Sequence, residues 1–102
     1  MSSLSLDQLK ETPGARPGET HDHRVKRLAM RSMRRGIKEM DIILSKYADD
    51  QLADMNGAEL DLYEALLGEN DQDLYQWVSG QQSAPAHLSE LIEHIARHTG
   101  AR

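Results

Sequence analysis

The sequence predicts an all-α protein folded as a compact bundle of five short helices. Apolar residues recur every three to four positions in five segments, the spacing that gives a helix one buried face. Glycine, proline or a capping residue separates these segments, and no stretch alternates apolar and polar residues as a strand does. A single domain is expected, because the chain has only 102 residues.

The composition narrows the class of protein. The chain contains no cysteine, so neither a disulfide framework nor a thiolate metal site is possible. No apolar run approaches the ~20 residues that span a membrane, and the first residues show no signal-peptide core. We therefore expect a cytoplasmic, monomeric protein that does not insert into a membrane.

Residues 1–20 are expected to form a flexible tail ahead of a single helical domain over residues 21–102. The tail contains Thr-Pro-Gly and Arg-Pro-Gly, which are turn signals, and it has no sustained apolar period.

The first two predicted helices cover residues 21–35 and 37–47, on either side of Gly36. The apolar positions of the first are Val25, Leu28 and Ala29, with Met30 and Met33 beside them. Those of the second are Ile37, Met40, Ile43, Leu44 and Tyr47. A glycine inside a helix costs about 1 kcal/mol relative to alanine. Gly36 therefore marks either a helix break or a close approach of another group.

A third helix is expected to begin after Asn56 and to stop at Gly68. Asn56 is a favoured N-cap residue, and Glu59, three positions on, completes a variant of the capping box. Leu52 and Met55 are expected to fill the preceding loop. The buried face of this helix consists of Leu60, Tyr63, Leu66 and Leu67.

A fourth helix is expected between a cap at Asn70 or Asp71 and its end at Gly80. Its anchors are Leu74, Trp77 and Val78. Trp77 is assigned to the core, because large aromatic side chains are mostly buried, and Tyr75, on the opposite side, is the better candidate for an exposed contact.

A fifth helix is expected from the Ser-Ala-Pro sequence at residues 83–85 to the neighbourhood of Gly100. Its apolar stripe consists of Leu88, Leu91, Ile92 and Ile95.

Charge is distributed unevenly along the chain, although the net charge is only −5. Seven basic residues fall between positions 24 and 38, whereas from Glu39 to Glu93 thirteen acidic residues accompany a single basic one, Lys46. A dipolar molecule of this kind favours oriented docking on a protein partner. The basic segment alone would suit nucleic acid, but the acidic remainder would repel phosphates.

No catalytic machinery is recognisable in the sequence, and an enzyme is not expected. His94 and His98 lie one helical turn apart with Glu90 one turn earlier, a face that could hold zinc, but the solvated face of an amphipathic helix explains them more simply. Asp71 and Asp73 have the spacing of a calcium loop without its glycine and final glutamate, so helix capping accounts for them. No metal site is predicted.

The remaining candidate is the segment from Arg35 to Glu39. It is either a helix–helix junction, with a solvated Arg35–Glu39 pair worth about 0.3 kcal/mol, or a contact surface. In the second case Gly36 would let a partner backbone approach, Arg35 would offer a bidentate fork, and Glu39 would be an acceptor on the same face.

The sequence resembles the SdhE family of assembly, or flavinylation, factors of succinate dehydrogenase. The resemblance covers residues 24–80, with a matching last helix, and rests on an ordered set of motifs: Arg35-Gly36-x-x-Glu39-x-Asp41, Glu59…Tyr63-Glu64-x-Leu66-Leu67 and Asp71-x-Asp73-Leu74-x-x-Trp77.

The resemblance implies a five-helix protein that binds the flavoprotein subunit of succinate dehydrogenase and, for some bacterial members, that of fumarate reductase. It implies that the factor promotes covalent attachment of FAD to a histidine of that subunit. The sequence shows no obvious flavin pocket, so no cofactor of its own is expected. The partner-binding residues it implies here are Arg35, Gly36, Glu39 and Asp41. Two alternatives stay open: a nucleic-acid-binding or antitoxin-like regulator that uses the basic first helix, and a metal enzyme built on His94 and His98.

Overall fold

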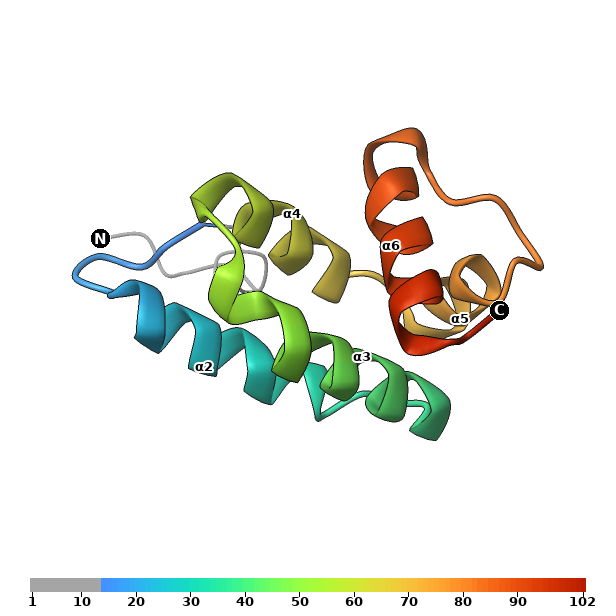
Figure 1. The fold of residues 1–102 in the computed structure, drawn as a ribbon, viewed down its shortest axis with the longest axis horizontal. Helices are drawn as coiled ribbons and strands as arrows, with labels where there is room; N and C mark the ends of the chain where they lie inside the picture. The colour runs from blue at the N-terminus through green and yellow to red at the C-terminus, as the bar shows by residue number, and fades with distance from the viewer. Residues whose placement is uncertain (1–13) are drawn as a thin grey trace, which may run out of the picture.

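The computed structural model describes residues 14–102, and its helices are arranged around one core (Figure 1). The α-helices of this range are α2 (His21–Ser32), α3 (Lys38–Gln51), α4 (Gly57–Leu67), α5 (Asp71–Val78) and α6 (Ser89–Thr99). The single-turn 3₁₀ helices η1 (Leu52–Asp54) and η2 (Ala86–Leu88) precede α4 and α6. The described residues contain no strand, and the predicted all-α bundle of five helices is confirmed.

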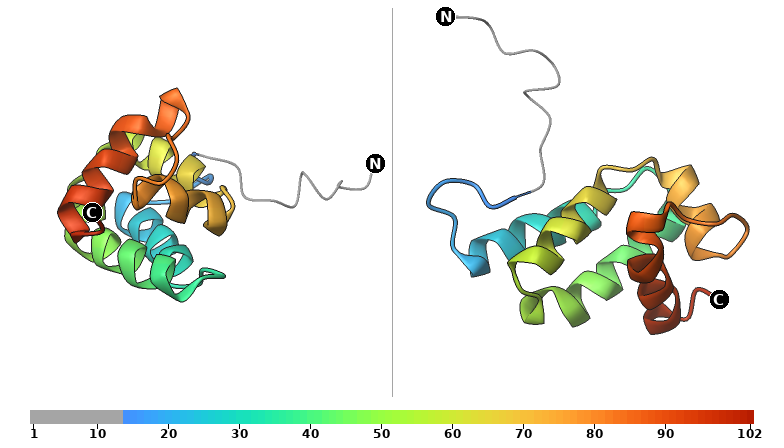
Figure 2. Two further views of the ribbon diagram at one scale, coloured as in Figure 1. Left: turned by 90° about the vertical axis from the view of Figure 1, so that its right-hand side faces the viewer. Right: turned by 90° about the horizontal axis from the view of Figure 1, so that it is seen from above.

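Helix α3 connects the two halves of the molecule. Helices α2 and α3 lie side by side in opposite directions, and α4 packs across α2 (Figures 1 and 2). At the other end, α5 and α6 pack against each other and against α3. The loop between α2 and α3 therefore comes to lie beside the turn between α4 and α5.

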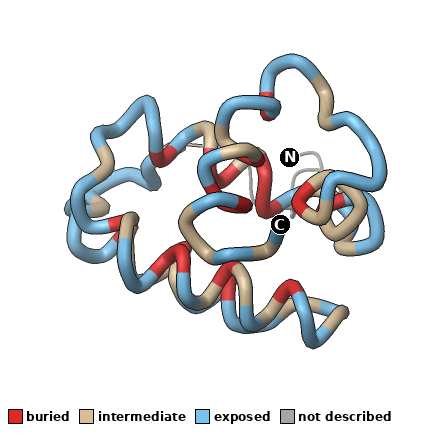
Figure 3. Tube along the Cα trace, turned by 45° about the vertical axis from the view of Figure 1, so that its right-hand side comes forward, coloured by how far each residue is buried: buried red, intermediate tan, exposed pale blue. Residues whose placement is uncertain are grey.

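The core is built from the apolar stripes of all five helices. Buried residues recur along one side of successive helical turns, as burial of an amphipathic face requires (Figure 3). The largest fully buried side chains are Tyr47, Tyr63, Leu28, Met40, Leu44, Leu52, Leu60, Leu66, Leu74, Leu88, Ile92 and Ile95. Stripe positions in each predicted helix are among them.

The two helix ends beside Gly36 differ from the prediction. Helix α2 ends at Ser32 rather than at residue 35, because the backbone N–H of Arg35 donates to the Asp41 carboxylate instead of to a carbonyl of the preceding turn. Helix α3 continues to Gln51 rather than stopping near residue 47. Its last turn is held by Asp50, which binds both Lys46 and His98.

The caps of the later helices follow the sequence closely. Asn56 and Glu59 form the predicted capping box, and Asn70 is the N-cap of α5. The last helix begins at Ser89, later than predicted, because the residues after Pro85 first form the 3₁₀ turn η2. It ends at Gly100, whose φ of +72° suits a residue without a Cβ.

Some apolar residues are less buried than predicted. Leu91 and Trp77 are half-buried at the edge of the core, and Tyr75 is half-buried as well rather than exposed. Met30 and Met33 are 51% and 61% exposed. The stripes therefore give the direction of the core correctly, but residues at the margins of each stripe reach the surface.

Residues 14–20 of the predicted tail contact the helices. Glu19 accepts hydrogen bonds from Arg27 at 2.7 and 2.9 Å, and the N–H of Gly14 donates to Glu64 at 3.2 Å. Thr20 caps α2. The rest of the predicted tail lies outside the described residues.

Candidate functional site: the Arg35–Gly36 junction

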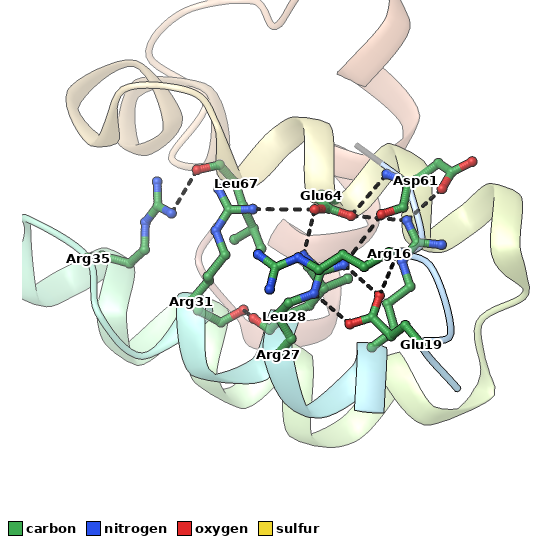
Figure 4. Close-up of polar contacts among 12 residues, drawn as sticks. Arg16, Glu19, Arg27, Leu28, Arg31, Arg35, Asp61, Glu64 and Leu67 are labelled. Carbon is green, nitrogen blue, oxygen red and sulfur yellow. Dashed lines mark hydrogen bonds and ion pairs between the residues drawn. The ribbon is translucent and has the colours of Figure 1, made fainter. Parts of the chain in front are cut away.

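The loop between α2 and α3 is fixed by the side chain of Arg35. Its Nε donates to Oδ1 of Asp71 at 2.7 Å. Its two terminal nitrogens donate to the carbonyls of Leu67 and Glu69 at 2.9 and 3.1 Å. Arg35 therefore binds the last carbonyl of α4, a carbonyl of the following turn and the first carboxylate of α5 together (Figure 4 shows the bond to Leu67).

Arg35 is thus not the exposed fork that the sequence predicts. Its side chain is 9% exposed, and its ion-pair partner is Asp71, 15% exposed, rather than the local Glu39. The predicted solvated Arg35–Glu39 pair is wrong for a physical reason. The α4–α5 turn brings a carboxylate and two free carbonyls to the same place, and a guanidinium can satisfy all three at once.

The group that closely approaches Gly36 is the Asp71 carboxylate of the same chain. The backbone N–H of Gly36 donates to Oδ2 of Asp71, so this carboxylate binds Arg35 with one oxygen and Gly36 with the other. A Cβ on residue 36 would lie 3.1 Å from that oxygen. A side chain at this position would crowd the carboxylate, which would have to move by a few tenths of an ångström.

Glu39 and Asp41 occupy the first turns of α3. Both carboxylates lie near the positive end of the helix dipole. Asp41 is half-buried and accepts the N–H of Arg35 at 2.6 Å, so it shapes the loop. Glu39 is exposed, and within the described residues its side chain has no hydrogen-bond or ion-pair partner. Of the four residues implied by the resemblance, Gly36 and Glu39 are therefore exposed, whereas Arg35 and Asp41 are half-buried and fix the loop.

A second, buried cluster lies between α2 and α4. Glu64 has a side chain only 1% exposed and binds Arg24 at 3.0 Å and Arg27 at 2.8 Å, with Arg31 at 3.8 Å (Figure 4). Arg24 also binds Asp61. We refer to Arg24, Arg27, Arg31 and Glu64 as the Glu64 cluster.

The Glu64 cluster shows that much of the basic segment is paired within the chain and is not available as a basic surface. Four of its seven basic residues, counting Arg35 with the three arginines of the cluster, bind carboxylates of the same chain. The exposed basic residues of this segment are Lys26, Arg34 and Lys38. The basic surface is therefore much smaller than the sequence suggests.

The ion pairing of Glu64 and that of Asp71 were not predicted, but the sequence does carry a signal for Glu64. Glu64 lies four positions after Leu60 and three before Leu67, both buried, so it stands on the buried face of its helix. A carboxylate on such a face needs cationic partners, and the arginine-rich first helix supplies them. For Asp71 the sequence indicates helix capping only, because its bond to Gly36 depends on tertiary structure.

Two features are absent from the described part of the chain. Residues 14–102 contain no group of three or more His, Cys, Asp or Glu side chains that could hold a metal ion. In the same range, no helix combines the length and the apolar character that crossing a membrane requires.

Comparison with known proteins shows that the chain is similar to a family of flavinators of succinate dehydrogenase. Residues 26–99 match the family model described as flavinator of succinate dehydrogenase, a range that includes the junction and the Glu64 cluster except for Arg24.

Three similar relatives are each named succinate dehydrogenase assembly factor 2, mitochondrial. The protein of Meyerozyma guilliermondii is 37% identical over 76% of this chain and 54% of its own length. That of Candida glabrata is 42% identical over 72% and 48%. That of Schizosaccharomyces japonicus is 36% identical over 97% and 73%. The chain thus spans about half the length of the first two relatives.

Proposed function

This chain belongs to the family of succinate dehydrogenase flavinators, and we propose that it is an assembly factor that promotes covalent attachment of FAD to the flavoprotein subunit of succinate dehydrogenase. The match over residues 26–99 carries this proposal. The flavoprotein of fumarate reductase, which is chemically related, is proposed as a second partner. We propose that the factor is not an enzyme and that FAD stays with the partner.

We propose the surface of the Arg35–Gly36 junction as the docking site. Gly36 presents backbone without a side chain, and the exposed Glu39 lies one helical turn further on. Arg35 and Asp41 would act as positioning residues, because they fix the loop through Asp71 and the N–H of Arg35. A rigid surface of this kind loses little conformational freedom on binding, so more of its contact energy contributes to affinity.

The mechanism that follows is positioning. Covalent flavin attachment needs the FAD methyl group and a histidine of the flavoprotein to be held in a reactive geometry. A factor that stabilises this arrangement of the partner can accelerate the reaction without taking part in its chemistry, and well-oriented groups gain on the order of 7 kcal/mol. The chemistry stays with flavin and flavoprotein.

The pairing of the arginines argues against the nucleic-acid alternative. A DNA-binding helix needs several cations free to contact phosphates, whereas Arg24, Arg27 and Arg31 of α2 contact Glu64. We propose that the protein acts in the cytoplasm, the compartment that the sequence favours. The relatives named above are, by their names, mitochondrial.

The test compares two exposed carboxylates on the same helix. Glu39→Ala removes the proposed contact, and Asp49→Ala removes a carboxylate at the far end of α3. Each variant is expressed as the only copy in cells, and covalent flavin on the flavoprotein is measured by in-gel fluorescence. We expect Glu39→Ala to lose most of the covalent flavin, because a central interface residue contributes about 2 kcal/mol or more. Asp49→Ala should behave as the wild type.

Both variants should stay within about 1 kcal/mol of the wild type in the free energy of unfolding, since neither carboxylate has a partner within the described residues and the helix dipole contributes no more than this at an exposed helix end. Normal flavin loading with Glu39→Ala would contradict the docking site and leave the function open to other surfaces. Normal loading in cells without any copy of the protein would contradict the proposed function itself.

A further inference from the structure

A groove lies at the end of α3 opposite to the Arg35–Gly36 junction. It has a volume of about 400 Å³ and is formed where α6 contacts the C-terminal half of α3, beside η1 and the start of α4. Helix α3 has 14 residues, and at ~1.5 Å per residue it separates the groove from Gly36 by about 20 Å. The groove is therefore a different surface from the proposed docking site.

The inner wall of the groove is apolar. Met55, Leu62 and Leu91 line it, and all three are half-buried. The partial exposure of Leu91, which the helical stripe did not predict, has its explanation here, because this side chain packs on the edge of the core and also lines the groove. The wall offers a surface for the aliphatic part of a ligand.

The rim of the groove is acidic. Asp54, Glu59 and Glu90 lie along it from η1, α4 and α6, and all three are exposed. Glu59 uses one oxygen for the capping box, while the side chains of Asp54 and Glu90 have no hydrogen-bond or ion-pair partner in the described part of the chain. Among residues 14–102, no lysine or arginine lines the groove. Three carboxylates around an apolar surface attract a group that is cationic at one end and aliphatic along its length.

The wall of the groove also contains Tyr47 and His94, whose side chains contact each other. His94 lies with its Nδ1 2.6 Å from the hydroxyl of Tyr47. Burial raises the pKa of Tyr47 to about 12, so its hydroxyl keeps its proton. The pair is a polar contact of the wall, and the three carboxylates are the acidic groups of the groove.

We propose that this groove binds a basic segment of a partner protein, in which an arginine or lysine lies next to an apolar residue. The aliphatic part of the basic side chain would pack on Met55, Leu62 and Leu91, and its charged end would bind Asp54 and Glu90. In residues 14–102 no lysine or arginine lines the groove, so the cation would be supplied from outside the groove itself, and we assign it to a partner. This proposal is independent of the function proposed above.

The test uses the full chain and a defined set of peptides. The probe is a pool of blocked hexapeptides in which Leu or Val alternates with Arg or Lys, and a second pool has Gln at each basic position. Binding is followed by NMR chemical-shift changes of backbone amides. We expect saturable binding of the basic pool, shifts concentrated at Met55, Leu62 and Leu91, and no binding of the Gln pool.

Two double variants separate the groove from general electrostatic attraction. Asp54→Asn with Glu90→Gln removes two rim charges, and Asp49→Asn with Asp73→Asn removes two exposed charges elsewhere, so the net charge changes equally. We expect at least tenfold weaker binding in the first variant and less than a twofold change in the second.

Four results of the peptide-binding measurements would overturn the proposal. These are absence of saturable binding in the whole basic pool, an equal loss in both double variants, equally tight binding of arginine amide alone, and shifts located outside the groove. Sedimentation showing that a second copy of the chain fills the groove would also overturn it, since the partner would then be the protein itself.

Discussion

The arginines of one basic segment are used in two different ways. In the Glu64 cluster, three guanidinium groups surround a carboxylate that is 1% exposed, between α2 and α4. At the junction, a single guanidinium binds a carboxylate that is 15% exposed together with the carbonyls of Leu67 and Glu69. The first arrangement is enclosed, whereas the second lies directly beneath the exposed backbone of Gly36.

This difference shows that the charge of a sequence segment is a poor guide to the charge of a surface. Glu64 turns the basic face of α2 into an internal contact, because a buried carboxylate must be compensated by nearby cations. Arg35 instead fixes a loop and leaves Gly36 and Glu39 available for contact. The largest effects of substitution should therefore occur at the cluster and smaller ones at the junction.

The first prediction concerns Glu64 itself. Glu64→Ala leaves Arg24 and Arg27 in a buried position without their shared carboxylate, and we expect a loss of about 3–5 kcal/mol in the free energy of unfolding. Urea denaturation measures it. The matched control is Asp61→Ala on the same helix, whose carboxylate is 54% exposed and should cost about 1 kcal/mol or less. Equal stability of the two variants would show that the cluster is not a structural centre.

The second prediction concerns Arg35. Arg35→Ala removes the donor to Oδ1 of Asp71 and to the carbonyls of Leu67 and Glu69, and we expect a loss of about 2–3 kcal/mol in the free energy of unfolding, less than for Glu64 because the site is more exposed. The adjacent Arg34→Ala is the control, since the side chain of Arg34 is exposed and has no partner in the described chain. Thermal unfolding of both variants measures the difference. If Arg35→Ala had wild-type stability, the guanidinium of Arg35 would be exposed in solution, as the sequence suggested.

The fold was predictable because each helix carries its own local signals. Asn56 with Glu59 and Asn70 form caps through contacts within a few residues, and Gly100 ends its helix by its own backbone conformation. Such interactions depend on sequence spacing alone. The helix ends beside Gly36 were less accurate, since they depend on side chains that return from other parts of the structure.

The position of the junction between α2 and α3 was predictable, but the arrangement of its side chains was not. A glycine between basic and acidic residues marked the junction correctly, and the prediction of a close approach at Gly36 fits the contact with Asp71. The partner of Arg35 could not be found from spacing, because Asp71 lies 36 residues away in sequence. Contacts of this range are set by how α4 and α5 pack on α2 and α3, which helical periodicity does not specify.

The third prediction uses pH to measure the link between Glu19 and the Glu64 cluster. The hydrogen bonds from Arg27 lower the pKa of Glu19 from its ordinary 4.5 to about 2. Because the folded pKa is lowered, this contact stabilises the protein fully above about pH 4.5, and the stabilisation is lost as the pH falls towards 2. Glu19→Gln should therefore be less stable than the wild type at pH 7, by about 1–2 kcal/mol.

The difference between the two proteins should shrink between pH 4.5 and pH 2, the range that the lowered pKa defines. Chemical denaturation at several pH values measures it. A difference that stays constant over this range would show that the carboxylate of Glu19 is not held by Arg27 in solution.

The last prediction concerns the smallest group at the junction, the missing side chain of Gly36. In Gly36→Ala the new Cβ would lie 3.1 Å from Oδ2 of Asp71, with no other heavy atom within 4 Å beyond its chain neighbours. Arg35 and the N–H of residue 36 hold that carboxylate in place, so it cannot move away without lengthening a bond. We expect a net loss of about 1 kcal/mol in the free energy of unfolding.

In the background of Asp71→Ala the carboxylate is absent, and the same substitution should stabilise the protein by about 0.5 kcal/mol, because alanine restricts the unfolded chain more than glycine does. The sign of the effect should thus reverse between the two backgrounds when urea denaturation is compared across all four proteins. An effect of the same sign and size in both would mean that a group other than Asp71 requires glycine at position 36, and that this carboxylate does not determine the shape of the junction.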